Sequence, residues 1–322
     1  MPNRRRILQG LAAIPALLAA RSGRATPHES DNPGEADMSR YEDVWYQSID
    51  GLKLYARDYP NAAPRATVFC MHGLTRNSAD FAELAEALQS DYRVIAVDQR
   101  GRGRSAWDPN PANYNPLVYV RDMYTLLDRL GLQEVIVIGT SMGGIMSMIM
   151  SALQPKRFRA VVLNDIGPVI APAGLERIRS YVGKVPPVNS WAEAEARVRQ
   201  LNTHVFPHWQ GEDWARFTRK LYQENADGVP QLAHDPAIAQ SLKADPSAPP
   251  PDLWPSFQGL ANIPTLVVRG STSDILDLEC VAEMQRRKPD IQVVEVPGIG
   301  HAPMLDEPVA RRAVLEFVAA NA

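Results

Sequence analysis

Short apolar runs and amphipathic segments alternate through most of this chain. Runs of five or six mainly apolar residues indicate strands buried on both faces, and most are followed by a segment whose apolar positions recur with helical spacing. The predicted strands are residues 66–71, 92–97, 134–138, 158–163, 265–269 and 291–296, and the predicted helices are residues 79–89, 117–130, 142–153, 276–287 and 308–320. A regular alternation of this kind predicts βα units and a parallel sheet.

A different pattern precedes this alternation. Residues 41–49 and 52–59 are strand-like, and the dipeptide Asp50-Gly51 joins them. Asp-Gly between two alternating segments is a strong signal for a β-hairpin. We therefore expect an antiparallel pair of strands at the start of the fold.

The alternation also stops between residues 169 and 262. This stretch has no clear strand, is rich in proline and tryptophan, and has helix-like pieces at 192–201 and 214–225. Residues 249–251 are three consecutive prolines, which indicate a linker back to the sheet. We expect a core made of residues 41–168 and 263–322, interrupted by a mostly helical insertion at residues 169–262.

The composition is that of an ordinary globular protein. Of 322 residues, 45% are hydrophobic and 22% are charged, which excludes a disordered or collagen-like chain. The formal net charge is −3 and no basic face is evident, so nucleic acid is not an expected partner. Cys70 and Cys280 allow at most one disulfide, and we expect both to be buried free thiols.

The first 25 residues are expected to be an export signal. Three arginines, residues 4–6, precede an apolar run at 7–20 that is too short and too broken to span a bilayer stably. The segment from Asn3 to Gln9 resembles the twin-arginine signal that exports folded proteins in bacteria. The sequence therefore predicts an exported protein, periplasmic or secreted, with cleavage before Thr26 or, as an alternative, at Ala20.

Two further readings concern the same end of the chain. Residues 26–40 are polar, carry proline and glycine, and show no periodicity, which predicts a flexible linker. If Met38 were the true start, the protein would instead be cytoplasmic.

The clearest chemical motif lies between the predicted strand 134–138 and the predicted helix 142–153. It is Gly139-Thr140-Ser141-Met142-Gly143, a G-x-S-x-G turn in the strand–turn–helix context of a nucleophile elbow. The turn is so tight that the serine backbone is strained and larger flanking side chains would collide with the strand and the helix. The sequence thus predicts Ser141 as a nucleophile.

A serine hydroxyl needs a base to remove its proton, and the base needs an acid to orient it. In an open α/β sheet such groups gather beyond the carboxyl ends of the strands. His301 follows the strand 291–296 and Asp274 follows the strand 265–269, in the order Ser, Asp, His. We expect Ser141, Asp274 and His301 to form the triad. Asp165, which follows the strand 158–163, is the rival for the acid.

An oxyanion formed in such a reaction needs two backbone N–H donors. We expect one from Met142, directly after the nucleophile, and the other from Leu74, in the loop after the strand 66–71. His72 is expected to orient this loop. His204 and His208 have a metal-like spacing, but Pro207 interrupts any helix between them, so no metal site and no cofactor are expected.

The motifs together resemble the α/β-hydrolase superfamily. They are His72-Gly73, the stretch Asp98 to Ser105, Gly139 to Gly144, Gly270 to Asp274, and Gly300-His301, in family order from residue 41 to the C-terminus. The resemblance implies a mostly parallel eight-stranded sheet with helices on both faces, and a helical cap at 169–262 over the site. It also implies that the three arginines between Asp98 and Ser105 form salt bridges within that loop.

A serine at the elbow separates this chain from haloalkane dehalogenases and epoxide hydrolases of the same fold, which carry an aspartate there. The chain is more similar to serine esterases, lactonases and carbon–carbon bond hydrolases. We expect hydrolysis of a carboxylic ester or lactone through an acyl-enzyme, with a small-molecule ester or lactone as partner. The alternatives are carbon–carbon cleavage of a vinylogous diketone and, less favoured because all triad residue types are present, a non-catalytic binding protein. The four tryptophans of the cap are expected to pack in its core more often than to contact a ligand.

Overall fold

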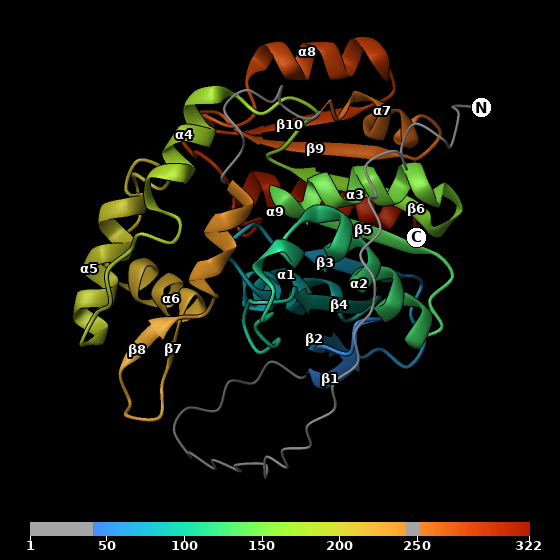
Figure 1. The fold of residues 1–322 in the computed structure, drawn as a ribbon. Coiled ribbons are helices and arrows are strands. Elements are labelled where there is room, and N and C mark those ends of the chain that lie inside the picture. Colours follow the sequence, from blue (N-terminus) through green and yellow to red (C-terminus); the bar gives the residue numbers. More distant parts are fainter. Residues whose placement is uncertain (1–40, 243–251) are drawn as a thin grey trace. The chain divides into compact units, whose positions relative to one another are not determined.

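The structure, a computed structural model, describes residues 41–242 and 252–322 (Figure 1). The predicted export signal, the linker at 26–40 and the triple proline at 249–251 lie outside the described residues. Within them, an eight-stranded sheet has the order β1-β2-β4-β3-β5-β6-β9-β10. Its strands are β1 (Glu42–Gln47), β2 (Lys53–Tyr59), β3 (Thr67–Met71), β4 (Arg93–Asp98), β5 (Val135–Thr140), β6 (Phe158–Asn164), β9 (Thr265–Gly270) and β10 (Gln292–Val296).

Most neighbouring strands of this sheet run parallel. β1 pairs antiparallel with β2 across the Asp50-Gly51 turn, and β2 pairs antiparallel with β4. The pairs from β4 through β3, β5, β6 and β9 to β10 are all parallel. The predicted hairpin and the predicted parallel sheet are both present, and parallel pairing brings the carboxyl ends of β3, β5, β6, β9 and β10 to one edge.

Alternating residues of the central strands face two apolar layers, because side chains on a strand point to opposite faces in turn. On β3, Phe69 and Met71 join the layer formed with α2 (Pro116–Arg129), α3 (Met142–Leu153) and α8 (Leu278–Arg287). Val68 and Cys70 join the opposite layer, formed with α1 (Ala82–Leu88) and α9 (Pro308–Ala320). The strands therefore read as continuous apolar runs because both of their faces are covered.

The insertion between β6 and β9 contributes α4 (Pro172–Tyr181), α5 (Trp191–Asn202) and α6 (Gly211–Leu221), which gather at one side of the sheet (Figure 1, left). It also contains a short antiparallel hairpin, β7 (Tyr222–Glu224) and β8 (Pro230–Leu232). The sequence did not indicate this hairpin, and α6 ends four residues earlier than predicted, because a three-residue strand is too short to carry a periodic signal.

The last part of the insertion packs differently. The short helix α7 (Trp254–Phe257) and the turn that follows it contact α3 of the core. A Cβ on Gly259 would lie 2.5 Å from the backbone of Ala152, which shows how closely the two segments approach. Phe257 and Leu260 accordingly belong to the same apolar layer as α3. The division of the chain into a core and a cap at residue 262 stays a prediction.

None of the helices in the described part of the chain has the length and apolar character needed to cross a membrane.

Candidate active site

The turn after β5 has the strained geometry that a nucleophile elbow requires. Ser141 adopts φ 51° and ψ −114°, a left-handed conformation that is unusual for a residue with a side chain. Its N–H donates to the carbonyl of Asn164 on β6, and its carbonyl accepts from Gly144 and Ile145 at the start of α3. These bonds fix the turn between the strand and the helix, so the backbone presents the hydroxyl at the edge of the sheet.

The glycines on either side of Ser141 are required by packing. A Cβ on Gly139 would lie 2.5 Å from the carbonyl of Gly143, and a Cβ on Gly143 would collide with the carbonyl of Met71 on β3. The sequence prediction that small residues are needed here is therefore explained by direct backbone contact between the turn, α3 and β3.

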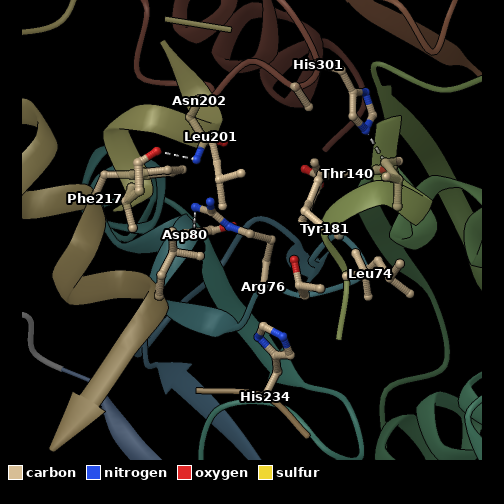
Figure 2. A pocket seen from close by; sticks show the side chains of 18 of the residues that line it. Leu74, Arg76, Asp80, Thr140, Tyr181, Leu201, Asn202, Phe217, His234 and His301 are labelled. Carbon is tan, nitrogen blue, oxygen red and sulfur yellow. Dashed lines mark hydrogen bonds and ion pairs between the residues drawn. The ribbon is translucent and has the colours of Figure 1, made fainter. Parts of the chain in front are cut away.

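Ser141 and His301 lie within hydrogen-bond distance. Ser141 Oγ is 2.9 Å from His301 Nε2, and His301 Nδ1 is 2.8 Å from Asp165 Oδ2 (the imidazole is labelled in Figure 2). A carboxylate can only accept, so Nδ1 carries the proton and Nε2 is left to accept from the serine hydroxyl. This is the orientation in which an imidazole can remove the proton of Ser141.

Asp165 is held in place by three further bonds. Its side chain is fully buried; Oδ1 accepts from the N–H of Gly270 at 2.8 Å, and Oδ2 accepts from Ser273 Oγ at 2.6 Å. Its own N–H donates to Val268 on β9 at 2.7 Å. Because Asp165 follows β6, which lies between β5 and β9, the sheet order itself places this carboxylate between the serine and the histidine strands.

The expectation that Asp274 pairs with His301 is wrong in this structure. Asp274 instead accepts from Arg177 of α4, at 2.5 Å to Nε and 2.8 Å to Nη2. Burial raises the pKa of the Asp274 carboxyl, but the hydrogen bonds and charge of Arg177 outweigh burial and hold this pKa below its usual value. The loop from Gly270 carries Asp274 outward to the insertion, while Ser273 of the same loop turns inward to Asp165.

The available signal for Asp165 was its position directly after a strand end, whereas Asp274 stands four residues beyond the last residue of β9. The guanidinium that engages Asp274 comes from a helix whose packing no sequence pattern indicated.

Of the two expected oxyanion donors, Leu74 lines the pocket and Met142 directly follows Ser141 in the chain. Met142 is the first residue of α3, where the N–H groups have no partner within the helix. Leu74 and Gly73 line the pocket together with Ser141 and His301.

His72 is buried and orients the loop that carries Gly73 and Leu74. Its Nδ1 donates to the carbonyl of Gly73 at 2.7 Å, and its Nε2 accepts from the N–H of Gln99 at 3.1 Å. Burial lowers the pKa of His72 to about 3, so this histidine is neutral.

Two of the three arginines after β4 form salt bridges, as the resemblance implied, but their partners lie outside the loop from Asp98 to Ser105. Arg100 contacts three aspartates, Asp50, Asp108 and Asp122, and Arg104 contacts Asp43.

Arg102 differs from both of these neighbours. It is fully buried, and no carboxylate of the described residues lies within ion-pair distance of it. Its Nε donates to the carbonyl of Leu74 at 2.8 Å and its Nη2 lies 3.8 Å from Met142 Sδ. This guanidinium therefore touches both residues expected to supply the oxyanion donors.

The pocket above Ser141 is built jointly by strand-end loops of the core and by the insertion. Its lining is mainly apolar and aromatic, and its insertion residues include Tyr181, Val198, Leu201, Phe206, Phe217 and Tyr222. Two polar groups stand out in Figure 2: Arg76, which is bonded to Asp80, and His234. None of the four tryptophans of the insertion is among the lining residues; Trp209 and Trp214 pack instead against Phe206 and Phe217.

The remaining candidates lie apart from this chemistry. His204 and His208 do not line the pocket, and no cluster of three or more metal-ligating side chains occurs in the described part of the chain. Cys70 and Cys280 are both buried and unpaired, and burial raises the pKa of each thiol.

Comparison with known proteins places these features in context. The chain is 39% identical over 254 residues to the 3-hydroxybutyrate-oligomer hydrolase of Cupriavidus necator, covering 77% of this chain and 86% of that protein. It is 30% identical over 233 residues to the 2-(acetamidomethylene)succinate hydrolase of Mesorhizobium japonicum, covering 71% and 79%.

A solved α/β hydrolase of Novosphingobium aromaticivorans is similar in structure, with a TM-score of 0.83 and 40% identity over 88% of this chain and 99% of that one. The family model described as the alpha/beta hydrolase fold matches residues 66–308. The chain therefore belongs to the α/β-hydrolase fold family, whose relatives named above are hydrolases.

Proposed function

We propose that this protein is a serine hydrolase that cleaves carboxylic esters of 3-hydroxy acids through an acyl-enzyme. The observation that carries the proposal is the chain of two hydrogen bonds from Ser141 through His301 to the buried carboxylate of Asp165. These residues stand at the edge of a mainly apolar pocket, next to the N-terminus of α3. The combination meets the requirements of nucleophile, base, orienting acid and oxyanion donors.

In the acylation step, Ser141 Oγ attacks the ester carbonyl carbon while His301 Nε2 takes the hydroxyl proton. The carbonyl π electrons move to oxygen, and the N–H groups of Met142 and Leu74 stabilise the oxyanion. Collapse of this intermediate breaks the bond to the alcohol oxygen, which receives the proton from His301. Asp165 keeps the imidazole in the correct tautomer and stabilises its transient positive charge.

In the deacylation step, water replaces the alcohol. His301 removes a proton from the water, the resulting hydroxide attacks the acyl carbon, and the second tetrahedral intermediate forms in the same oxyanion hole. Its collapse returns the proton to Ser141 Oγ and releases the carboxylic acid. No other reactant is required.

The substrate class rests on the relative from Cupriavidus necator, whose name states that it hydrolyses 3-hydroxybutyrate oligomers. Each linkage in such an oligomer is a carboxylic ester of a short aliphatic acid, which suits a pocket whose lining is mainly apolar and aromatic. Hydrolysis of lactones and of vinylogous diketones requires the same triad. A comparison of hydrolysis rates on linear esters, lactones and diketones therefore shows which class is the substrate.

The first experiment tests the nucleophile. A fluorophosphonate probe should label the wild-type protein once, and peptide mass spectrometry should place the label on Ser141. The Ser141→Ala protein should keep its thermal unfolding temperature, take no label and lose at least about a thousandfold in ester hydrolysis. Labelling of another residue, or ester hydrolysis retained in the Ser141→Ala protein, would contradict the proposal.

The second experiment tests the acyl-enzyme and the substrate class. Esters with one acyl group and different alcohols should give the same ratio of methyl ester to acid when methanol competes with water, because they share one intermediate. A panel of 3-hydroxybutyrate dimer, simple butyrate esters, lactones and a vinylogous diketone should show the highest kcat/KM for the dimer. A highest value for the diketone would instead favour carbon–carbon bond hydrolysis.

A further inference from the structure

The pocket above Ser141 has charged side chains in its mainly apolar wall. Histidines aside, the charged lining residues in the described part of the chain are Arg76, Arg197 and Asp80. The two arginines exceed the single carboxylate by one positive charge. An apolar pocket with an excess of positive charge suits a substrate that carries a negative group.

Arg76 is held in one orientation that leaves part of its guanidinium unused. Its Nε and Nη2 donate to the two carboxylate oxygens of Asp80 at 2.7 and 2.5 Å, and Nη2 also lies 3.7 Å from Met304 Sδ. Its Cζ lies over the ring of Phe217, 4.1 Å from the ring centroid. A guanidinium has five N–H donors along its edges, and the two on Nη1 bond to none of the described residues.

The unused donors of Arg76 are accessible to a ligand. The side chain is 17% exposed and lines the pocket, and Nη1 does not belong to the unpaired polar atoms that are sealed from solvent. Figure 2 shows Arg76 in the middle of the pocket view, between Asp80 on one side and Tyr181 on the other. A guanidinium fixed in this way is pre-organised, which is what a binding group requires.

Gly73 shows how close Arg76 lies to the nucleophile. A Cβ on Gly73 would lie 3.5 Å from Arg76 Cγ and 3.7 Å from Ser141 Cβ, so those two atoms are no farther apart than the sum of these distances. The end of the Arg76 side chain reaches Met304, which follows His301 on the same loop. Since His301 protonates the departing alcohol, Arg76 lies on the alcohol side of the scissile bond.

An ester between two 3-hydroxy acids places a negative group on this side. The alcohol that departs is itself a hydroxy acid, and in an extended chain its carboxylate oxygens lie about 6 Å from the ester carbonyl carbon. This length matches the approach of Arg76 to Ser141, and the long arginine side chain covers the remainder. A carboxylate that meets a guanidinium forms charge-assisted hydrogen bonds, which are stronger than bonds between neutral groups.

We propose that Arg76 forms a carboxylate-binding subsite for the alcohol part of the substrate, through its Nη1 donors. The inference rests on the proposed ester hydrolysis and deepens it, because it names the group that distinguishes a hydroxy acid ester from the ester of a plain alcohol. An oligomer of 3-hydroxy acids is then cleaved at its carboxyl end, since only the terminal unit has a free carboxylate.

The experiment compares 3-(butyryloxy)butyrate with 3-(butyryloxy)butyramide, which share the acyl group and differ in one negative charge on the alcohol part. Released butyrate is quantified by chromatography, and each rate is corrected for the reactivity of the ester toward hydroxide. The wild-type kcat/KM should favour the carboxylate by at least about tenfold. In the Arg76→Met protein this ratio should fall to one or below, because Asp80 then repels the carboxylate. The Arg76→Lys protein, which keeps the charge, should retain part of the preference.

The matched control is Arg216→Met, the same substitution at a half-exposed arginine of the insertion that does not line the pocket; it should leave the ratio unchanged. A wild-type protein without a preference for the carboxylate overturns the subsite before any variant is made. An Arg76→Met protein that keeps the full preference also overturns it, as does an equal loss of preference in the Arg216→Met protein.

Ethyl butyrate, whose alcohol has no carboxylate, separates failure of the subsite from failure of the proposed function. A wild-type protein that hydrolyses ethyl butyrate but neither of the paired esters contradicts the subsite alone. A wild-type protein that hydrolyses none of the three esters contradicts the proposed ester hydrolysis.

Discussion

Two aspartates near the end of the sheet have opposite surroundings, and this difference decides their roles. Asp165 is fully buried and its carboxylate accepts bonds from a backbone N–H, a hydroxyl and His301. Asp274 is partly exposed and satisfied by the guanidinium of Arg177. The first arrangement orients an imidazole, and the second fastens α4 to the loop after β9.

Exchanging each carboxylate for an amide tests this assignment. Asp165→Asn should lower kcat by about a thousandfold or more, because an amide can donate to Nδ1 and stabilise the wrong tautomer of His301. Asp274→Asn should lower kcat by less than about tenfold, since it only weakens a partly exposed ion pair. Steady-state kinetics on one ester, with thermal unfolding of both proteins, checks the prediction. Equal losses in the two variants would contradict the assignment of the acid to Asp165.

Arg102 is the second residue whose surroundings imply a role. Its guanidinium bonds the Leu74 carbonyl and contacts the side-chain sulfur of Met142, so we expect it to hold in place the segments that carry both proposed oxyanion donors. Arg102→Met should lower kcat by about ten- to a hundredfold with little change in KM, a smaller loss than the roughly 3 kcal/mol that accompanies removal of a whole oxyanion donor.

A boronic acid that mimics the tetrahedral intermediate distinguishes misplaced oxyanion donors from a general loss of folded structure in the Arg102→Met protein. Its affinity for the Arg102→Met protein should fall in parallel with kcat/KM. The control is Arg104→Met, which removes a half-exposed arginine paired with Asp43 and should leave both quantities within about threefold. A loss of kcat with unchanged boronic acid affinity would count against a role in the oxyanion hole.

At the scale of elements, the elbow depends on close contact between α3 and β3. The contact leaves no room for a Cβ on Gly143, which would collide with the carbonyl of Met71. Gly143→Ala should therefore reduce the free energy of unfolding by about 2 kcal/mol or more and displace Ser141, which lowers kcat as well. At Gly211, the first residue of α6, an added Cβ would meet nothing within 4 Å, so Gly211→Ala should be close to neutral. Chemical denaturation of both variants gives the comparison.

The elements themselves were largely predictable. All eight strands of the sheet and the helices α2, α3, α5, α8 and α9 were predicted within two residues of their observed ends, and the predicted segment 79–89 contains α1. Their apolar periodicity is strong because each is packed against a large layer. The helix α4 and the hairpin of β7 and β8 were missed, since α4 buries only Gly174 fully and each strand of the hairpin has three residues.

At the scale of the whole molecule, buried neutral histidines make stability depend on pH. Burial lowers the pKa of His72 to about 3 and of His234 to about 4, below the value near 6.5 of an unfolded histidine. Between these values the unfolded chain binds protons that the folded chain does not, so the folded state loses stability as the pH falls below about 6.5. Each histidine contributes up to about 1.4 kcal/mol per pH unit in this window.

Unfolding free energies measured from pH 7.5 to 5 should show this decline. His234→Gln should have a shallower slope than the wild type over the same range, because one of the two groups is gone. A His234→Gln protein whose slope equals that of the wild type would show that His234 is not held neutral by the fold.

We also propose that the full-length protein is exported, on the strength of the arginine-led apolar segment at residues 3–20, which lies outside the described residues. Expression in a bacterium with a twin-arginine pathway should yield a periplasmic or secreted product beginning at Thr26. Replacing Arg4 and Arg5 with lysines should retain the protein in the cytoplasm. An uncleaved product in the cytoplasm of the parent strain would contradict export.

Sequence by itself determined the sheet, the elbow and the expectation that Ser141 and His301 lie together. Their signals are local: a strand, a glycine-flanked turn and a helix are encoded by neighbouring residues, and parallel pairing then brings Ser141 and His301 to one edge. Only the tertiary structure decided between Asp165 and Asp274, because the choice depends on where a loop leads and on an arginine from a distant helix. The same holds for the surroundings of Arg102 and His234, which arise from contacts between segments far apart in the chain.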